Sequence, residues 1–479
     1  AWTVPNLFRR LLGEGALSAV FVPVLTRKLQ KEGEAGARRS LSIVFGTLFA
    51  LLSLLVVAGM LLVFVLPDDA LGRSGVPESG ALTRRLLLTL LPYMLPICLV
   101  ALAAAAQNVR GRFALPSLAP FVLNCFWIAA LLYVSGRGDG ATLTEKALLV
   151  AGALLVGGLF QLLLQLPGLA RSGMLVRPRL DRRDESLRET GRTMLPMLLG
   201  LSVIQLNVLA NQVIAAYLVP DIGGNSVIFL AVRLLEFPHA LVGIALGTAV
   251  FPLLSHLGKL NETDALGHTL DKALSLGLLV AIPAAGGLFV LAPELVDVLF
   301  VSGRFTSADG LETAWCLRIL SLSLPGLITI QILARAHYAL EELRRPVRIA
   351  VAMFVTSLVL NLFLAPRWGT YSLAATSSLS ALGNACLLYL SLRSFVLPRF
   401  ALTLRSIGKS LAATVPMALT AWVAARWGQQ IAPAPAPFVQ RLMLHLLMPV
   451  GAAILAFLLA AWLLHVTELR ELLQRSKRR

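Results

Sequence analysis

Charge is what this sequence has least of. Only 14% of its 479 residues are Asp, Glu, Lys or Arg, whereas soluble globular domains average about 25%. Apolar residues make up 57% of the chain, and its mean hydropathy is +0.80. A soluble core of this chain length cannot enclose that much apolar surface. The composition therefore excludes a water-soluble globular protein and indicates a lipid bilayer as the solvent.

Cysteine is scarce as well. The four cysteines are far apart, and each lies in an apolar stretch: Cys98, Cys125, Cys316 and Cys386. This spacing excludes a disulfide framework and a cysteine-based metal site. We therefore expect the cysteines to be packing residues, and nothing in the sequence calls for a metal or a cofactor.

Enzyme signatures are missing too. The sequence has no G-x-x-x-x-G-K-[ST] phosphate loop, no H-E-x-x-H zinc helix and no G-x-S-x-G nucleophile turn. We therefore expect no enzymatic activity and no direct use of ATP by this chain. A net charge of +17 would suit nucleic acid, but no aromatic–basic RNA-binding pattern is present, so nucleic acid is not an expected partner.

What the sequence does have is a succession of apolar segments separated by short polar breaks. Because a helix needs about 20 apolar residues to cross a bilayer, these segments predict an all-α membrane protein, a polytopic bundle of about 13 spans. The longest break, 169–192, is a charged loop. The predicted spans are 5–26, 41–66, 86–108, 117–134, 147–168, 193–218, 227–254, 273–299, 311–334, 349–365, 371–392, 410–425 and 442–465.

The basic residues are distributed unevenly between the two sets of loops. If Ala1 lies outside the cytoplasm, the cytoplasmic loops and tail hold 29 of the 42 Lys and Arg residues, and the opposite loops hold 9. Cytoplasmic loops of membrane proteins carry such an excess. This distribution predicts a cytoplasmic Arg479 and explains the high net charge without nucleic acid. The four remaining basic residues lie within predicted spans: Arg9, Arg10, Arg233 and Arg318.

The chain also repeats itself weakly. The stretch from Pro92 to Asn124 is echoed from Pro325 to Asn361, with a basic loop before Pro116 in the first copy and before Pro346 in the second. Transporters often consist of two such halves with the substrate site between them. We predict two pseudo-symmetric lobes, 1–168 and 193–400, joined by a cytoplasmic loop at 169–192. Two further helices and a basic tail occupy 401–479.

Two clusters of ionisable residues fall inside predicted spans at repeated positions. Arg10 and Glu14 lie four residues apart on one helix face, next to Arg9, and Arg233 and Glu236 lie three apart on another. An arginine inside a bilayer costs about 2.5–3.5 kcal/mol and usually faces a bundle interior or a cavity. The surplus of arginine suits an anionic substrate such as pyrophosphate. We predict that these five residues bind substrate; the alternative is that each Arg–Glu pair only neutralises itself and joins two helices.

Three stretches of the sequence resemble the MurJ/MviN family, a branch of the multidrug/oligosaccharidyl-lipid/polysaccharide exporter superfamily. The first begins at Pro5 and runs as P-N-L-F-R-R-L-L-G-E-G-A to Ala16, leading to F-V-P-V-L. The second begins with R-L-L-E-F-P at Arg233 and continues as G-I-A-L-G-T to P-L-L-S. The third is the loop from Tyr338 to Val347.

The resemblance implies a function. Family members flip lipid II, the undecaprenyl-pyrophosphate-linked peptidoglycan precursor, from the cytoplasmic to the periplasmic leaflet of the bacterial inner membrane by alternating access. Arg9, Arg10 and Arg233 match the cationic cavity of the family, and Glu14 matches its cavity acid. Members have fourteen helices with both ends cytoplasmic, so we expect one helix to precede Ala1. The expected partners are lipid II and membrane lipids, and the cell-wall synthesis machinery is a candidate.

The sequence departs from the family at two positions. Val232 stands where some members have Asp, and Asn211 stands where some relatives hold sodium with an acidic residue. Two other functions fit the same class of protein. An exporter of a drug or another lipid-linked saccharide is one, although a cationic drug would require a surplus of cavity acids. A non-transporting scaffold of the cell-wall machinery is the other, and it would tolerate loss of the arginines.

The orientation can be tested by cysteine labelling. A single cysteine placed within 169–192 should react with a membrane-impermeant maleimide only after the cells are permeabilised, because the positive-inside distribution places this loop in the cytoplasm. Labelling of the same cysteine in intact cells would reverse the predicted orientation.

Overall fold

The computed structural model describes residues 2–9, 17–72, 79–136, 140, 142–181, 183–219, 223–260, 262–303, 305–342, 344–396, 400–432 and 437–464. Every named element in these ranges is a helix, and one isolated bridge pairs Ser302 with Phe305. The chain divides into two compact units, Ala1–Leu209 and Ala210–Arg479. The predicted lobe boundaries stay predictions.

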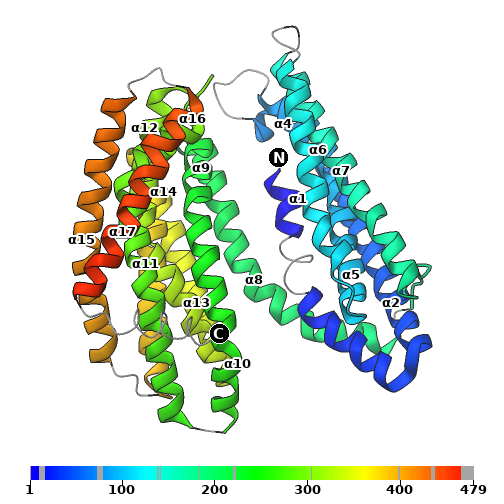
Figure 1. The fold of residues 1–479 in the computed structure, drawn as a ribbon. Coiled ribbons are helices and arrows are strands. Elements are labelled where there is room, and N and C mark those ends of the chain that lie inside the picture. The colour runs from blue at the N-terminus through cyan, green and yellow to red at the C-terminus, as the bar shows by residue number, and fades with distance from the viewer. Residues whose placement is uncertain are drawn as a thin grey trace. The chain divides into compact units, whose positions relative to one another are not determined.

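The first unit holds α1 to α7 and most of α8 (Figure 1). Its helices are α1 (Thr3–Phe8), α2 (Leu17–Val65), α3 (Asp68–Leu71), α4 (Ser79–Leu90), the 3-10 turn η2 (Leu91–Tyr93), α5 (Met94–Val109), α6 (Ala114–Gly136), α7 (Leu143–Arg171) and α8 (Glu185–Tyr217).

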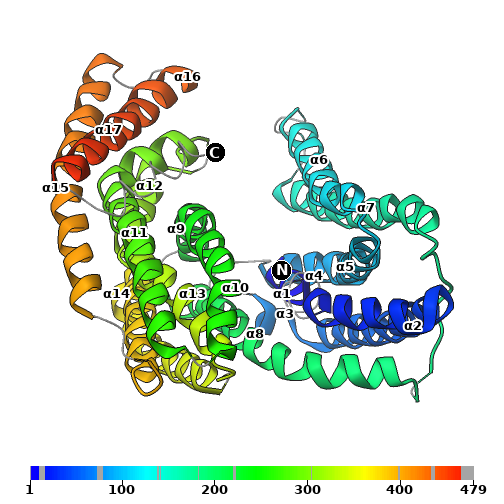
Figure 2. The same cartoon turned by 60° about the horizontal axis from the view of Figure 1, so that its bottom comes forward.

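The second unit holds the end of α8 and the remaining helices. They are α9 (Gly224–Pro238), the π-helix η4 (His239–Ile244), α10 (Ala245–Lys259), α11 (Thr263–Phe300), α12 (Ser307–Ser321), α13 (Leu324–Ala339), α14 (Arg344–Leu392), α15 (Phe400–Ile431), α16 (Phe438–Arg441), the π-helix η5 (Leu442–Leu447) and α17 (Met448–Leu463). Within this unit α15 packs against α11, and α17 packs against α15 (Figures 1 and 2).

The helices confirm the predicted all-α membrane fold. Within the described residues, nine helices are long and apolar enough to cross a membrane, and α12 with α13, bent by 42°, makes a tenth. This number is lower than thirteen partly because α14 contains both predicted spans 349–365 and 371–392. Gly369 interrupts the helical dihedrals between them, with φ 57° and ψ −141°, values that a residue without Cβ adopts at little cost.

The segment between α7 and α8 packs along α2 within the first unit. The backbone N–H of Arg179 donates to the carbonyl of Ser42 at 3.1 Å. A Cβ on Gly46 would lie 2.2 Å from the carbonyl oxygen of Arg179, so this glycine allows the extended chain to approach the helix. Two ion pairs then join α2 to the start of α8, Lys28 to Glu185 at 3.4 Å and Arg27 to Glu189.

The predicted internal repeat has a structural counterpart in two loops. In the α5–α6 loop the N–H of Arg112 donates to the carbonyl of Gln107 at 3.0 Å, and in the α13–α14 loop the N–H of Glu342 donates to the carbonyl of His337 at 2.9 Å. The residue before each donor has a left-handed backbone, φ 68° at Gly111 and φ 60° at Glu341. The two loops therefore end their helices in the same way.

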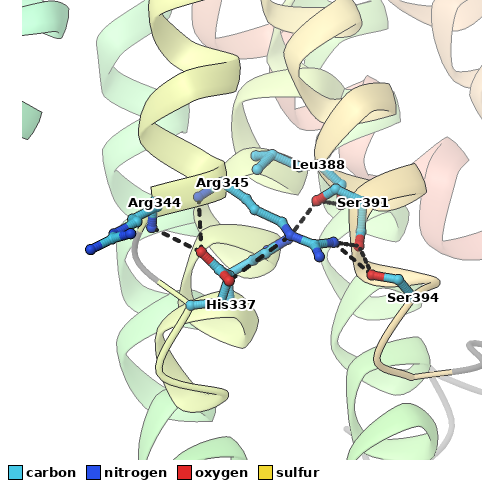
Figure 3. Close-up of polar contacts among 7 residues, drawn as sticks. His337, Arg344, Arg345, Leu388, Ser391 and Ser394 are labelled. Carbon is cyan, nitrogen blue, oxygen red and sulfur yellow. Dashed lines mark hydrogen bonds and ion pairs between the residues drawn. The ribbon is translucent and has the colours of Figure 1, made fainter.

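Each loop also begins with a fully buried polar residue that contacts a helical segment beyond the one that follows the loop, either α7 or the part of α14 after Gly369. Gln107 Nε2 donates to Gln165 Oε1 on α7 at 2.6 Å, and His337 Nε2 lies 2.7 Å from Ser391 Oγ on α14 (Figure 3). His337 Nδ1 lies 2.8 Å from the carbonyl of Leu333, so in the neutral ring Nδ1 donates and Nε2 accepts from the hydroxyl. These contacts fix each loop against the rest of its unit.

The left-handed residue of the second loop is a site of backbone strain. A left-handed conformation costs a residue with a Cβ about 1–2 kcal/mol, so Glu341→Gly should raise the midpoint of thermal unfolding in detergent. Gly111→Ala, the matched change in the first loop, should lower it for the same reason. A rise in the Gly111→Ala protein would contradict the shared geometry of the two loops.

Candidate functional site

Arg9 follows the short helix α1, which is anchored by aromatic packing in the first unit. The ring of Trp2 lies 5.3 Å from that of Tyr93 and 5.7 Å from that of Trp127. The side chain of Arg9 is oriented locally, because its Nε donates to Asn6 Oδ1 at 2.8 Å. The aromatic packing of Trp2 against the buried Tyr93 therefore helps to determine where this arginine lies within its unit.

The other two predicted residues of this cluster, Arg10 and Glu14, lie outside the described residues. Their pairing on one helix face stays a prediction. So does the predicted cavity between the two arginine clusters, because the clusters belong to different units.

Arg233 and Glu236 on α9 form the ion pair that their spacing indicates. Arg233 Nη1 lies 2.6 Å from Glu236 Oε2, and the two side chains remain 41% and 38% exposed. The guanidinium also stands over the ring of Phe229, 4.9 Å from its centroid. Only Nη1 of Arg233 has a hydrogen-bond partner among the described residues. The guanidinium is thus held from two sides while two of its nitrogens stay available to an anion.

The helix that carries this pair changes its winding directly after it. Pro238 has no N–H to continue the α-helical ladder, and the next six residues form the π-helix η4. Wider turns of this kind occur often at functional sites. The turn leads to Gly247, where a Cβ would lie 1.9 Å from Nη1 of Arg335 on α13. The glycines of the G-x-A-x-G-T stretch therefore have a packing role.

Arg335 lies one residue beyond the predicted span 311–334. In the structure it is inside α13, more than a turn before the helix ends at Ala339. It is half-buried, and its Nη1 donates to the carbonyl and to Oε1 of Gln331 at 2.9 and 3.0 Å. The spacing of four between Gln331 and Arg335 was the signal that could have indicated this.

Asn211 belongs to a chain of neutral hydrogen bonds. Asn361 Nδ2 donates to Asn211 Oδ1 at 3.0 Å, and Thr376 Oγ1 donates to Asn361 Oδ1 at 2.6 Å. A sodium ion would need oxygens and preferably a carboxylate here, but the amide group of Asn361 directs N–H at the oxygen of Asn211. The described residues in these hydrogen bonds include no carboxylate, so no step of transport is assigned to sodium.

Comparison with known proteins identifies the family. The chain matches the family "Lipid II flippase MurJ" over residues 1–442. The chain belongs to the MurJ family. A probable lipid II flippase MurJ of Vibrio cholerae is 35% identical over 397 residues, 81% of this chain and 74% of the relative. The lipid II flippase MurJ of Burkholderia cenocepacia is 33% identical over 402 residues, 82% of this chain and 76% of the relative.

Solved structures agree on the fold. A lipid II flippase MurJ in an inward closed conformation matches with a TM-score of 0.76 and 20% identity, covering 98% of this chain and 91% of that one. An inward-facing multidrug resistance transporter of the MATE family matches with a TM-score of 0.65 and 14% identity, covering 85% and 96%. The chain is therefore a multi-pass helical membrane protein of the MurJ family with a transporter fold.

The hydrogen bonds among Asn211, Asn361 and Thr376 should contribute to the stability of the folded protein. Asn361 is fully buried, so Asn361→Ala removes two buried side-chain hydrogen bonds, to Asn211 and from Thr376, and should lower the free energy of unfolding by about 1–3 kcal/mol. Ser380→Ala is the control, because the hydroxyl of Ser380 makes only a 3.4 Å contact with a carbonyl. Equal midpoints of thermal unfolding for the two variants would contradict a stabilising role of the hydrogen bonds among Asn211, Asn361 and Thr376.

Proposed function

We propose that this chain flips lipid II from the cytoplasmic to the periplasmic leaflet of the bacterial inner membrane by alternating access. The observation that carries the proposal is membership of the lipid II flippase family over residues 1–442. The substrate has a pyrophosphate, which must cross a hydrocarbon region about 30 Å thick. A protein that moves this group needs fixed cations within its spans.

Arg233 meets this need in the second unit. A guanidinium can donate two parallel N–H bonds to a phosphate, and such charge-assisted pairs are about twice as strong as neutral hydrogen bonds. Glu236 keeps the arginine oriented at 2.6 Å when no substrate is bound. It also competes with the pyrophosphate for the same guanidinium, so the substrate is exchanged and is not trapped.

Arg9 has the corresponding role in the first unit, with Arg10 and Glu14 as its predicted neighbours. Arg9 projects from a helix whose Trp2 ring packs against the buried Tyr93, and its Nε donates to the Asn6 amide oxygen of the same turn. We propose that the arginines of the two units bind the pyrophosphate in different stages of one transport cycle.

The membrane potential is a sufficient source of energy. A charge that crosses the membrane gains or loses about 2.3 kcal/mol per 100 mV. The cytoplasm is negative, so outward movement of an anionic pyrophosphate is favourable. The absence of a nucleotide-binding motif in the sequence agrees with this source of energy.

Substitution of the arginines distinguishes lipid II flipping from the two alternative functions, export of another substrate and a non-transporting scaffold. In a bacterium depleted of its own flippase, Arg233→Ala and Arg9→Ala should abolish growth while membrane abundance stays near that of the parent. Arg233→Lys should grow poorly, because Lys lacks the bidentate fork. The measurement is growth paired with immunoblots of the membrane fraction.

Arg318→Ala is the matched control for this experiment. Its guanidinium lies 4.7 Å from the ring centroid of Trp315 and donates to the carbonyl of Phe289, so its role is local and growth should be normal. Normal growth of both Arg233→Ala and Arg9→Ala would favour the scaffold. Loss of growth together with loss of the protein would favour a purely structural role for the pairs.

A further inference from the structure

Arg335 is a cation inside a membrane-spanning helix that no described carboxylate neutralises. Among the described residues its guanidinium bonds only the oxygens of Gln331, one turn earlier on α13. An arginine at membrane depth costs about 2.5–3.5 kcal/mol and generally has an anionic or carbonyl partner. The backbone carbonyl and the amide of Gln331 are both neutral, so the positive charge of Arg335 stays in place.

A second helix, α10, determines where this guanidinium lies. Gly247 on α10 faces it so closely that a Cβ would lie 1.9 Å from Nη1 and 2.6 Å from Cζ. A long cationic side chain at a helix end usually extends along the surface toward water. Arg335 instead lies against the backbone of α10, in a notch that only glycine leaves open. We call Arg335, Gln331 and Gly247 the notch site.

The notch site is separate from the Arg233–Glu236 pair. Gly247 lies fourteen positions after Arg233 along α9, η4 and α10, and with a rise of about 1.5 Å per residue the two sites are roughly 20 Å apart along the helix axis. The predicted orientation places the notch site nearer the cytoplasm. Tyr338, three residues after Arg335 and exposed, adds a hydroxyl on the same helix face.

We infer that the notch site is a second phosphate-binding site of this unit, at which the pyrophosphate of the lipid-linked substrate binds on the cytoplasmic side. This inference rests on the proposed function. The guanidinium of Arg335 offers its remaining N–H groups to the phosphate, and Gln331 keeps the fork oriented. The headgroup of an anionic phospholipid carries the same phosphate chemistry and is the other source of the ligand.

Binding to purified protein in nanodiscs tests the inference with two probes, lipid II and phosphatidylglycerol. Arg335→Gln should weaken lipid II binding about tenfold. Gly247→Ala should weaken it similarly, because the added Cβ displaces the guanidinium without removing its charge, and the end of an arginine side chain can move without unfolding the helices. Size-exclusion profiles check that both variants fold.

Arg344→Gln is the charge-matched control. Arg344 belongs to the same end of the unit and is exposed, and its side chain points away from the network of Arg345 and Ser391 (Figure 3). Its removal lowers the local charge by the same amount outside the notch, so its lipid II affinity should stay within about twofold of the parent.

The outcomes separate the two proposals. Weaker lipid II binding by both notch variants supports the inference. Loss of bound phosphatidylglycerol with unchanged lipid II affinity would overturn the substrate role and assign the notch site to a phospholipid headgroup. Unchanged binding of both probes would overturn the site altogether. Failure of the parent and the Arg344→Gln protein to bind lipid II would instead count against the proposed function, and phosphatidylglycerol binding would still test Arg335.

Discussion

Hydrocarbon offers no hydrogen-bond partner to a polypeptide backbone, and the architecture of this chain depends on that constraint. Each backbone group within the membrane must be satisfied inside the protein, so the spans are helices. Their interruptions fall where a residue can leave helical geometry at small cost, as at Gly33 and Gly369. The same constraint acts on side chains: Gln161 Nε2 on α7 donates to the carbonyl of Ala119 on α6 at 2.5 Å.

Helices in a bilayer gain little from the hydrophobic effect when they pack, so close approach matters more. Glycine provides that approach at several crossings. A Cβ on Gly258 would lie 2.3 Å from the carbonyl of Ala339, and one on Gly428 would lie 2.2 Å from the carbonyl of Leu444. At Gly247 the missing Cβ makes room for the guanidinium of Arg335 and not for the backbone of another helix.

Two arginines of the second unit, Arg233 and Arg335, therefore differ in how their charge is balanced. Arg233 has a carboxylate on its own helix and stays partly exposed, so it can exchange one anion for another. Arg335 bonds the carbonyl and the side-chain amide of Gln331 and no described carboxylate, so it can bind an anion without displacing one.

The sequence by itself determined the membrane class, the helical spans, the repeat and the Arg233–Glu236 pair. Each of these depends on composition or on spacing within a few residues, and a helix converts spacing directly into position. Only the tertiary structure decided that Arg335 lies in the Gly247 notch and that Asn211 bonds Asn361. Those contacts join residues 88 and 150 positions apart, and no local pattern indicates which helix faces will meet. Their partners are set by the packing of whole helices, which the sequence encodes only collectively.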